Sequence, residues 1–263
     1  MVTRNRLPIL RTCVAEILRY THIPYTLVIA DDGSTDGTAS WVHSQNLSVI
    51  SGRQRGCAWN KNRALYYLQS YTNCDPLLII EDDTWPTADG WGSVWSAAAH
   101  NWQHVNYCYG LDPKNLPAGR GSADAPYQCA AFGGQCTITT RQALAEVGFL
   151  NSRFTGYGWE HVEWTHRYRL RYKTRWGLPE GMFPCLDYGV KVTWPPSFYN
   201  QDEVDRNGRV YAGIRTEISG HYYTSAWRND AERQQLQAEV TNGWEVSQLS
   251  WKERGKNKGP YSS

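Results

Sequence analysis

The chain has 263 residues, with 27 lysines and arginines against 25 aspartates and glutamates, so its formal net charge is only +2. This length can bury a sizeable core, and a charge so near zero does not by itself indicate a nucleic-acid-binding protein. There is no run of about 18 apolar residues, no basic-apolar leader and no CxxC pair among the seven cysteines, so we expect a soluble, cytoplasmic protein without a membrane segment, a zinc site or a disulfide framework.

Short apolar strands alternate with helices along the chain. Helices are expected at residues 7–20, 60–71, 90–104, 141–147 and 228–240, with others after residue 37 and from residue 160. Strands are expected at residues 25–30, 47–50, 77–80, 107–110, 128–139 and 190–194, and residues 195–208 read as a polar loop. This alternation predicts a single-domain α/β fold with a mostly parallel central sheet flanked by helices. Neither GxGxxG nor GxxxxGK(S/T) occurs, which disfavours dinucleotide-binding and P-loop proteins.

The strand expected at residues 77–80 ends in three adjacent carboxylates, Glu81, Asp82 and Asp83. Ligands of open α/β sheets bind at the carboxyl ends of the strands, and adjacent, partly buried carboxylates are costly to keep ionised without a cation. A hard divalent ion that joins them to a diphosphate would resolve the repulsion. The alternative reading is a solvated acidic turn, which these three residues alone do not exclude.

A carboxylate and an imidazole, Glu160 and His161, open the helix that follows Gly156 and Gly158. Either side chain can accept a proton near neutral pH, so the pair is a candidate general base. The alternative is that the acidic residue complements the helix dipole, which accounts well for Glu160 and poorly for His161.

Four segments resemble the GT-A-fold glycosyltransferases of the family-2 type in their order and spacing. They are TRNR from residue 3, IADDGSTDGT from residue 29, GCAWNKNRAL from residue 56 and IIEDD from residue 79. A fifth segment, VGFLNSRFTGYGWEHVEWTHR from residue 147, is similar to the one in which that family carries an acidic catalytic base. The resemblance covers about residues 1–175, and DDGSTDGT is its most specific part.

The resemblance implies a nucleotide-sugar donor and Mn²⁺ or Mg²⁺ as the cofactor. Asp83 would hold the ion against the donor diphosphate, and His221 is the candidate for a further metal ligand, with a structural histidine as the alternative. Asp32 would meet the base or ribose, and Asp82 the ribose or donor sugar. The residues implied for nucleotide binding are Thr3, Asn5, Asp32, Lys61, Asn62 and Asp82.

Two features depart from the family pattern. The family's base usually follows the glutamate, where this chain has His161, so the base is either Glu160 or His161 itself. Glu163 would match the family's second acid, in a structural role. The first strand before TRNR is almost missing, so the sequence does not predict which strand forms the edge of the sheet.

The implied reaction is sugar transfer to an acceptor hydroxyl. A divalent ion would take up the charge of the leaving diphosphate, and one base facing the anomeric carbon implies displacement with inversion. We expect such a metal-dependent, inverting glycosyltransferase, with a UDP-sugar as the favoured donor. The rival hypothesis is a non-catalytic nucleotide-sugar or carbohydrate-binding module that has kept the fold.

The acceptor is expected to be a saccharide or DNA with 5-hydroxymethyl pyrimidines, the acceptor of phage-type DNA glycosyltransferases. Cations interleaved with aromatic residues suit phosphate contact and base stacking, although they could also pair with surface acids. The cations concerned are Arg167, Arg169, Arg171, Lys173 and Arg175. Residues 1–225 would form the glycosyltransferase domain, with a nucleotide-sugar half (1–110) and an acceptor and catalytic-base half (111–225), and residues 226–263 a C-terminal helix and basic tail.

Overall fold

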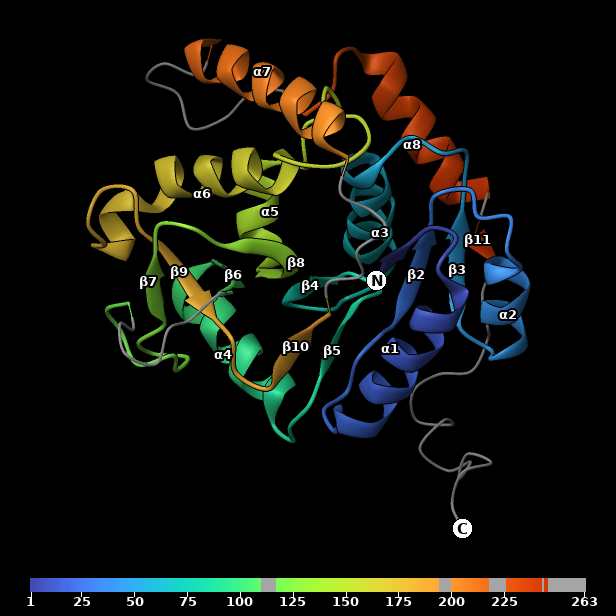
Figure 1. The fold of residues 1–263 in the computed structure, drawn as a ribbon, viewed down its shortest axis with the longest axis horizontal. Helices are drawn as coiled ribbons and strands as arrows, with labels where there is room; N and C mark the ends of the chain where they lie inside the picture. Colours follow the sequence, from blue (N-terminus) through green and yellow to red (C-terminus); the bar gives the residue numbers. More distant parts are fainter. Residues whose placement is uncertain (110–116, 194–199, 218–225, 243, 246–263) are drawn as a thin grey trace.

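A computed structural model of the chain describes residues 1–109, 117–193, 200–217, 226–242 and 244–245 (Figure 1). Its strands are β1 (Val2–Thr3), β2 (Val28–Asp31), β3 (Ser48–Ser51), β4 (Leu77–Ile80), β5 (Thr84–Pro86), β6 (His104–Tyr107), β7 (Tyr127–Cys129), β8 (Gly133–Thr139), β9 (Phe183–Leu186), β10 (Val190–Val192) and β11 (Trp244–Glu245). Its helices are α1 (Leu7–Tyr20), α2 (Thr38–Ser44), α3 (Cys57–Tyr71), α4 (Trp91–Trp102), α5 (Arg141–Val147), α6 (Glu160–Trp176), α7 (Gln201–Glu217) and α8 (Asp230–Asn242). Within these ranges no helix combines the length and apolar character needed to cross a membrane.

The central sheet has two parts that meet at β1. The first part has the order β1-β2-β3-β11, with β1, β2 and β3 parallel and β11 antiparallel to β3. The second has the order β4-β8-β6-β9-β7, and a parallel bridge between Val2 and Glu81 joins it to the first. The two-residue strand β1 therefore lies inside the sheet, between β2 and β4. Because these three strands run in one direction, their carboxyl ends open on the same edge of the sheet.

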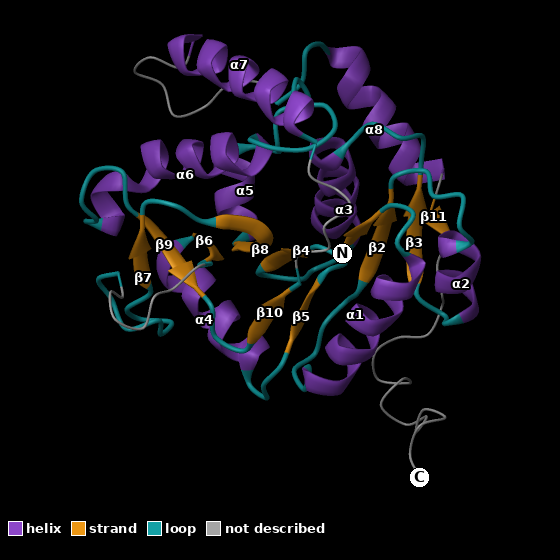
Figure 2. Cartoon of the chain, viewed as in Figure 1, coloured by secondary structure: helices purple, strands orange, loops and turns teal. Residues whose placement is uncertain are grey.

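Helices cover both faces of the sheet (Figure 2). On one face α3, α5 and α6 bury an apolar cluster that includes Leu65, Leu144 and Trp164. On the other face α1 and α4 bury a second cluster, with Leu10 and Trp95 fully enclosed. Helix α7 lies outside α6 in the same view (Figure 1). Burial of these two clusters holds the sheet rigid beneath the loops at its edge.

The α/β class with flanking helices is confirmed, but the prediction of a mostly parallel sheet is wrong for the second part. Strand β8 is antiparallel to both β4 and β6, and β7 is antiparallel to β9. Strand β6 is parallel to β9, so this part of the sheet is mixed. The stretch predicted as one strand over residues 128–139 is thus two strands, which lie apart in the sheet.

Local boundaries are closest to the prediction where the apolar period is clear. The helices predicted at residues 7–20 and 141–147 and the strand at 77–80 have those bounds in the structure. The polar loop predicted for residues 195–208 is wrong from Gln201 onward, where α7 begins. The basic tail predicted at the end of the chain lies almost wholly outside the described residues.

Candidate functional site

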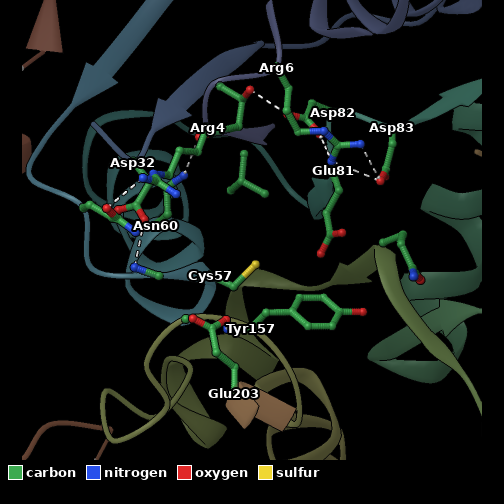
Figure 3. A pocket seen from close by; sticks show the side chains of 16 residues that line it. Arg4, Arg6, Asp32, Cys57, Asn60, Glu81, Asp82, Asp83, Tyr157 and Glu203 are labelled. Atoms are coloured by element: carbon green, nitrogen blue, oxygen red, sulfur yellow. Dashed lines mark hydrogen bonds and ion pairs between the residues drawn. The ribbon is translucent and has the colours of Figure 1, made fainter. Parts of the chain in front are cut away.

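A pocket of about 270 Å³ opens where β1, β2 and β4 end (Figure 3). The loop after β1, the loop before α3 and the residues after β4 form one side of it, and the loop before α6 together with α7 forms the other. Five carboxylates and two guanidinium groups line it, on Asp32, Glu81, Asp82, Asp83, Glu203, Arg4 and Arg6. A pocket with this excess of acidic groups attracts cations.

The acidic tip, which we define as Glu81, Asp82 and Asp83, lies at the end of β4. Asp82 is buried, and its carboxylate accepts hydrogen bonds from the Thr3 hydroxyl (2.6 Å) and the Arg6 guanidinium (2.7 Å). The same guanidinium donates twice to Asp83, each time over 3.1 Å. Arg6 therefore spans both aspartates, as Figure 3 shows.

The backbone at the tip is held from two directions. The amide of Glu81 donates to the Gln135 carbonyl (2.9 Å), and the carbonyl of Asp83 accepts from the amide of Thr193 (2.9 Å). The antiparallel pair β5 and β10 extends this anchoring directly after the tip. The three carboxylates are thus fixed on a rigid support before any ligand arrives.

Burial raises the pKa of Asp82 to about 7, and the nearby charges of Asp83 and Glu81 add to the shift. The Arg6 guanidinium and the Thr3 hydroxyl act in the opposite direction but do not cancel it. An acidic group with a pKa near neutrality in a pocket indicates a carboxylate that a further cation would stabilise in its charged form.

Asp32 lies in the wall that β2 and α3 build. Its two oxygens accept from the backbone amides of Arg55 (2.9 Å) and Gly56 (2.8 Å), and the buried Arg63 guanidinium donates to it from 2.9 Å. Gly56 has a φ of 93°, and a Cβ there would overlap the backbone of Gly156. This close approach lets the loop before α3 pass under the loop before α6, and so brings Asp32 and Tyr157 into one pocket.

Lys61 lies beneath the pocket between two acidic residues. Its ammonium nitrogen is 2.8 Å from Glu81 Oε1 and 3.1 Å from Glu160 Oε1, and all three side chains are largely or fully buried. Burial alone would lower the pKa of Lys61, but the two carboxylates outweigh it and raise that pKa well above its ordinary value. Burial would likewise raise the pKa of Glu160, yet Lys61 and His161 hold it well below its ordinary range.

The two candidate bases differ in their surroundings, and neither is among the residues lining the pocket. Glu160 is buried with one oxygen on Lys61 and the other without a hydrogen-bond partner. The side chain of His161 is 21% exposed, and its Nδ1 lies 3.7 Å from Glu160 Oε1. The ring packs edge-on against Phe132 and closely against Gly134, where a Cβ would overlap it. Gly134 directly precedes Gln135, which does line the pocket.

The structure brings together only part of the predicted nucleotide-binding set. Thr3, Asp32 and Asp82 line the pocket, as does the predicted metal ligand Asp83. Asn5 instead bridges to the loop after β2, where its amide donates to Ser34 (2.8 Å) and its side chain accepts from Thr35 (2.7 Å).

Asn62 is fully buried, and its side chain makes two hydrogen bonds, of 2.8 and 2.9 Å, with the backbone of Leu150. It thereby fastens α3 to the loop before α6. His221, the predicted second metal ligand, lies outside the described residues.

The sequence reasoning missed Arg6 and Glu203 as pocket residues. Arg6 belongs to the TRNR segment, where a basic residue after the first strand was the available indication. Glu203 had none, because the region around it was read as a polar loop. Its carboxylate accepts from the amide of Tyr157 (3.0 Å) and lies against Gly156, where a Cβ would overlap it.

Three of the five arginines and lysines of α6 contact neighbouring parts of the protein. Arg167 is buried in an ion pair with Glu163 (2.8 Å), and Arg169 donates to the carbonyls of Met182 and Pro179. Arg171 pairs with Glu146 (2.8 Å). Three of the five cations proposed to contact DNA therefore hold α6 to its neighbours, which removes much of the reason to favour a polyanionic acceptor.

The carboxylate oxygens at the acidic tip are the type of ligand that a hard divalent cation prefers. Asp82 and Asp83 offer carboxylate oxygens, and the Arg6 guanidinium already lies across both as a stand-in cation. A second cluster, Cys57, Glu81 and Glu160, also has its ligand atoms within 4.8 Å of one another. Lys61 places its ammonium against both carboxylates there, so that position already holds a cation. We take the tip as the candidate metal site, because Asp82 and Asp83 both line the pocket whereas Glu160 does not.

Comparisons with known proteins bear on the family and the fold. Residues 1–113 match the model of the family described as glycosyl transferase family 2. Among curated protein sequences no match is found.

Two solved structures share the fold. Mannosyltransferase PcManGT from Pyrobaculum calidifontis, in complex with GDP-Man and Mn²⁺, is 15% identical with a TM-score of 0.53, over 75% of this chain and 56% of that one. GalNAc-T7 with UDP, GalNAc and Mn²⁺ is 11% identical with a TM-score of 0.59, over 91% of this chain and 53% of that one. The chain thus spans little more than half the length of either. Residues 1–113 are thus similar to glycosyl transferase family 2, and the fold of the chain is that of the GT-A glycosyltransferases.

Proposed function

We propose that this protein is a metal-dependent glycosyltransferase that moves a sugar from a nucleotide sugar, with a UDP-sugar as the favoured donor, to an acceptor hydroxyl. The observation that carries the proposal is the convergence of Thr3, Asp32, Asp82 and Asp83 on one pocket. These side chains come from the ends of three parallel strands within the segment that matches the family. Both structural neighbours hold a sugar or nucleotide sugar together with Mn²⁺, which supports the same interpretation.

The residues of the pocket have separate roles in this proposal. Asp32, held by two backbone amides and Arg63, would receive the base or ribose, and Asp82 the ribose or donor sugar. Asp83, with Asp82 beside it, would hold Mn²⁺ or Mg²⁺. The ion would neutralise the charge that develops on the leaving diphosphate. The two halves, residues 1–110 for the donor and 111–225 for the acceptor, are part of the proposal.

For the general base we favour His161 over Glu160. The carboxylate of Glu160 is buried against Lys61 and its pKa is held low, so it accepts a proton poorly. The imidazole of His161 keeps part of its surface exposed beside the pocket-lining strand β8. A base on one side of the anomeric carbon and a leaving diphosphate on the other would give inversion. Glu160 would then hold Lys61 and orient the histidine.

For the acceptor we favour a saccharide over hydroxymethylated DNA. Arg167 and Arg169 are engaged within the protein, and Arg171 is exposed but paired with Glu146, which leaves Lys173 and Arg175 as the other exposed cations of that group on α6. Glu203 reaches into the pocket from α7, and a carboxylate there suits hydrogen bonds from sugar hydroxyls and repels phosphate.

The first experiment is a donor screen by titration calorimetry, with Mn²⁺ present, against UDP- and GDP-sugars. We expect one donor to bind, and Asp83→Asn to abolish binding of both metal and donor. Asp89→Asn is the matched control, because its exposed side chain pairs with His22 and lies outside the pocket lining. If no nucleotide sugar binds, or if Asp83→Asn binds it as well as the wild type does, the proposal fails.

The second experiment distinguishes a saccharide acceptor from a DNA acceptor. It also distinguishes a glycosyltransferase from a non-catalytic binding module. Transfer from the identified donor is measured to a panel of saccharides and to DNA with and without 5-hydroxymethyl groups. Slow metal-dependent hydrolysis of the donor without an acceptor would establish turnover and exclude a non-catalytic module. Transfer to hydroxymethylated DNA alone would overturn the preference for a saccharide.

A further inference from the structure

Arg6 is the described cation that joins both aspartates of the acidic tip. Its guanidinium lies 2.7 Å from Asp82 Oδ1 and 3.1 Å from Asp83 Oδ2, and it lines the pocket with only 14% of its side chain exposed. Asp83 Oδ2 accepts from both terminal nitrogens of the guanidinium. The oxygens that would face a metal are thus already neutralised by the protein itself.

A cation in this position competes with a divalent ion for the same oxygens. Asp83 Oδ2 already accepts two hydrogen bonds from the Arg6 guanidinium, which leaves it no free lone pair for a metal ion. Two cations a few ångströms apart also repel each other in a partly buried site. Metal binding to the tip alone must therefore displace the Arg6 guanidinium from the oxygens that it now contacts.

A donor diphosphate changes this balance, because it supplies a new partner for the displaced side chain. Guanidinium groups bind phosphate oxygens through paired hydrogen bonds, as they bind carboxylates. The backbone of Arg6 need not move, since its carbonyl accepts from the amides of Ile9 and Leu10 at the start of α1. Only the side chain has to turn from one wall of the pocket toward its interior.

We propose that Arg6 is exchanged between the acidic tip and the donor diphosphate, so that it suppresses metal binding to the free protein and makes metal and nucleotide bind cooperatively. The proposal rests on the proposed function for the identity of the nucleotide. Its first half concerns the metal alone and is independent of any donor.

The test is Mn²⁺ binding, followed by calorimetry and by the electron paramagnetic resonance signal of free Mn²⁺, with and without UDP or GDP. In the absence of nucleotide we expect Arg6→Gln to bind Mn²⁺ about tenfold more tightly than the wild type, which corresponds to about 1.4 kcal/mol. Arg6→Lys keeps the charge but loses the paired geometry and should fall between the two. Arg11→Gln is the matched control, because it removes the same charge from an exposed position on α1 that faces Trp41.

With UDP or GDP present, the gain in Mn²⁺ affinity should be at least severalfold larger for the wild type than for Arg6→Gln. Thermal unfolding checks that each variant is folded, and Arg6→Lys decides the question if the glutamine variant is not. Equal or weaker Mn²⁺ binding by the Arg6 variants without nucleotide overturns the inference, as does an absence of Mn²⁺ binding in all of them. If neither nucleotide binds, that result counts against the proposed donor, while Mn²⁺ binding without nucleotide still decides the role of Arg6.

Discussion

Lys61 on α3 donates a hydrogen bond of 3.1 Å to Glu160 at the start of α6, although the two residues are 99 positions apart in the chain. The same ammonium contacts Glu81 at the acidic tip (2.8 Å). One buried cation therefore connects the strand end that carries the predicted metal ligand with the helix start that carries the candidate base. A substitution of Lys61 should therefore affect both the acidic tip and the start of α6.

Replacement of Lys61 by methionine should destabilise the protein. It leaves Glu81 and Glu160 buried without their partner, and breaking a buried ion pair in this way typically costs about 3–5 kcal/mol. Urea unfolding measures the change, and Lys191→Met, at an exposed position on β10, is the control. The double variant Lys61→Met with Glu160→Gln should recover part of the loss. A Lys61→Met variant as stable as the wild type would mean that the three charges do not depend on each other.

Substitutions at the candidate bases should separate binding from transfer. We expect His161→Ala to keep donor affinity and to lower the transfer rate by about 10²–10⁴-fold, the usual contribution of a general base. Glu160→Gln should act mainly through stability, because Lys61 loses one of its two carboxylate partners. Calorimetry with the donor and single-turnover transfer assays measure the two effects. Full transfer by both single variants would show that neither residue is the base.

Because Gly56 lies close to Gly156, a side chain at position 56 should clash with the backbone. A substitution at a second glycine gives the loss of stability expected without that clash. Gly37 lies in the left-handed helical region (φ 87°, ψ 8°), and a Cβ there would meet nothing within 4 Å. Gly56 (φ 93°, ψ 177°) lies in a region almost restricted to glycine, and a Cβ there would also meet the backbone of Gly156. Gly37→Ala should therefore cost only about 1–2 kcal/mol of backbone strain. Gly56→Ala should cost clearly more and also weaken donor binding, because the two loops of the pocket must separate. Urea unfolding of both variants gives the comparison, and equal losses would rule out the clash.

The buried ring of His104 should make the free energy of unfolding depend on pH. Its ring is buried, stacks on Tyr168 with centroids 4.0 Å apart and makes a 2.9 Å hydrogen bond with Thr165, and burial lowers its pKa to about 3. The unfolded chain, with an ordinary histidine pKa near 6.5, then binds more protons than the folded protein between about pH 3 and 6.5. Stability should accordingly rise with pH across this window and fall as the solution is acidified.

The measurement is urea unfolding at intervals from pH 4 to 7. In His104→Gln the slope of stability against pH should decrease by up to about 1.4 kcal/mol per pH unit, which corresponds to one proton. His100→Gln controls for the loss of an exposed histidine. An unchanged slope in His104→Gln would show that this ring does not titrate on unfolding.

The sequence by itself was sufficient for the family, the α/β class and part of the pocket. Apolar runs that end in acidic turns are local patterns, and so is the period that places α1 and α5 at their observed bounds. Thr3, Asp32, Asp82 and Asp83 come together because the carboxyl ends of parallel strands meet at one edge of the sheet. Their roles in binding a donor and a metal remain predictions.

Only the tertiary structure decided which charges meet. Arg6 reaches Asp82 across 76 positions of the chain, and Glu203 enters the pocket from a helix that the sequence did not predict. It also decided that β8 pairs antiparallel with β4 and β6, and that Asn62 fastens the loop at Leu150. The physical reason is that local sequence determines the period and the ends of an element, whereas a buried charge takes its partner from whatever the packing of distant elements places within reach.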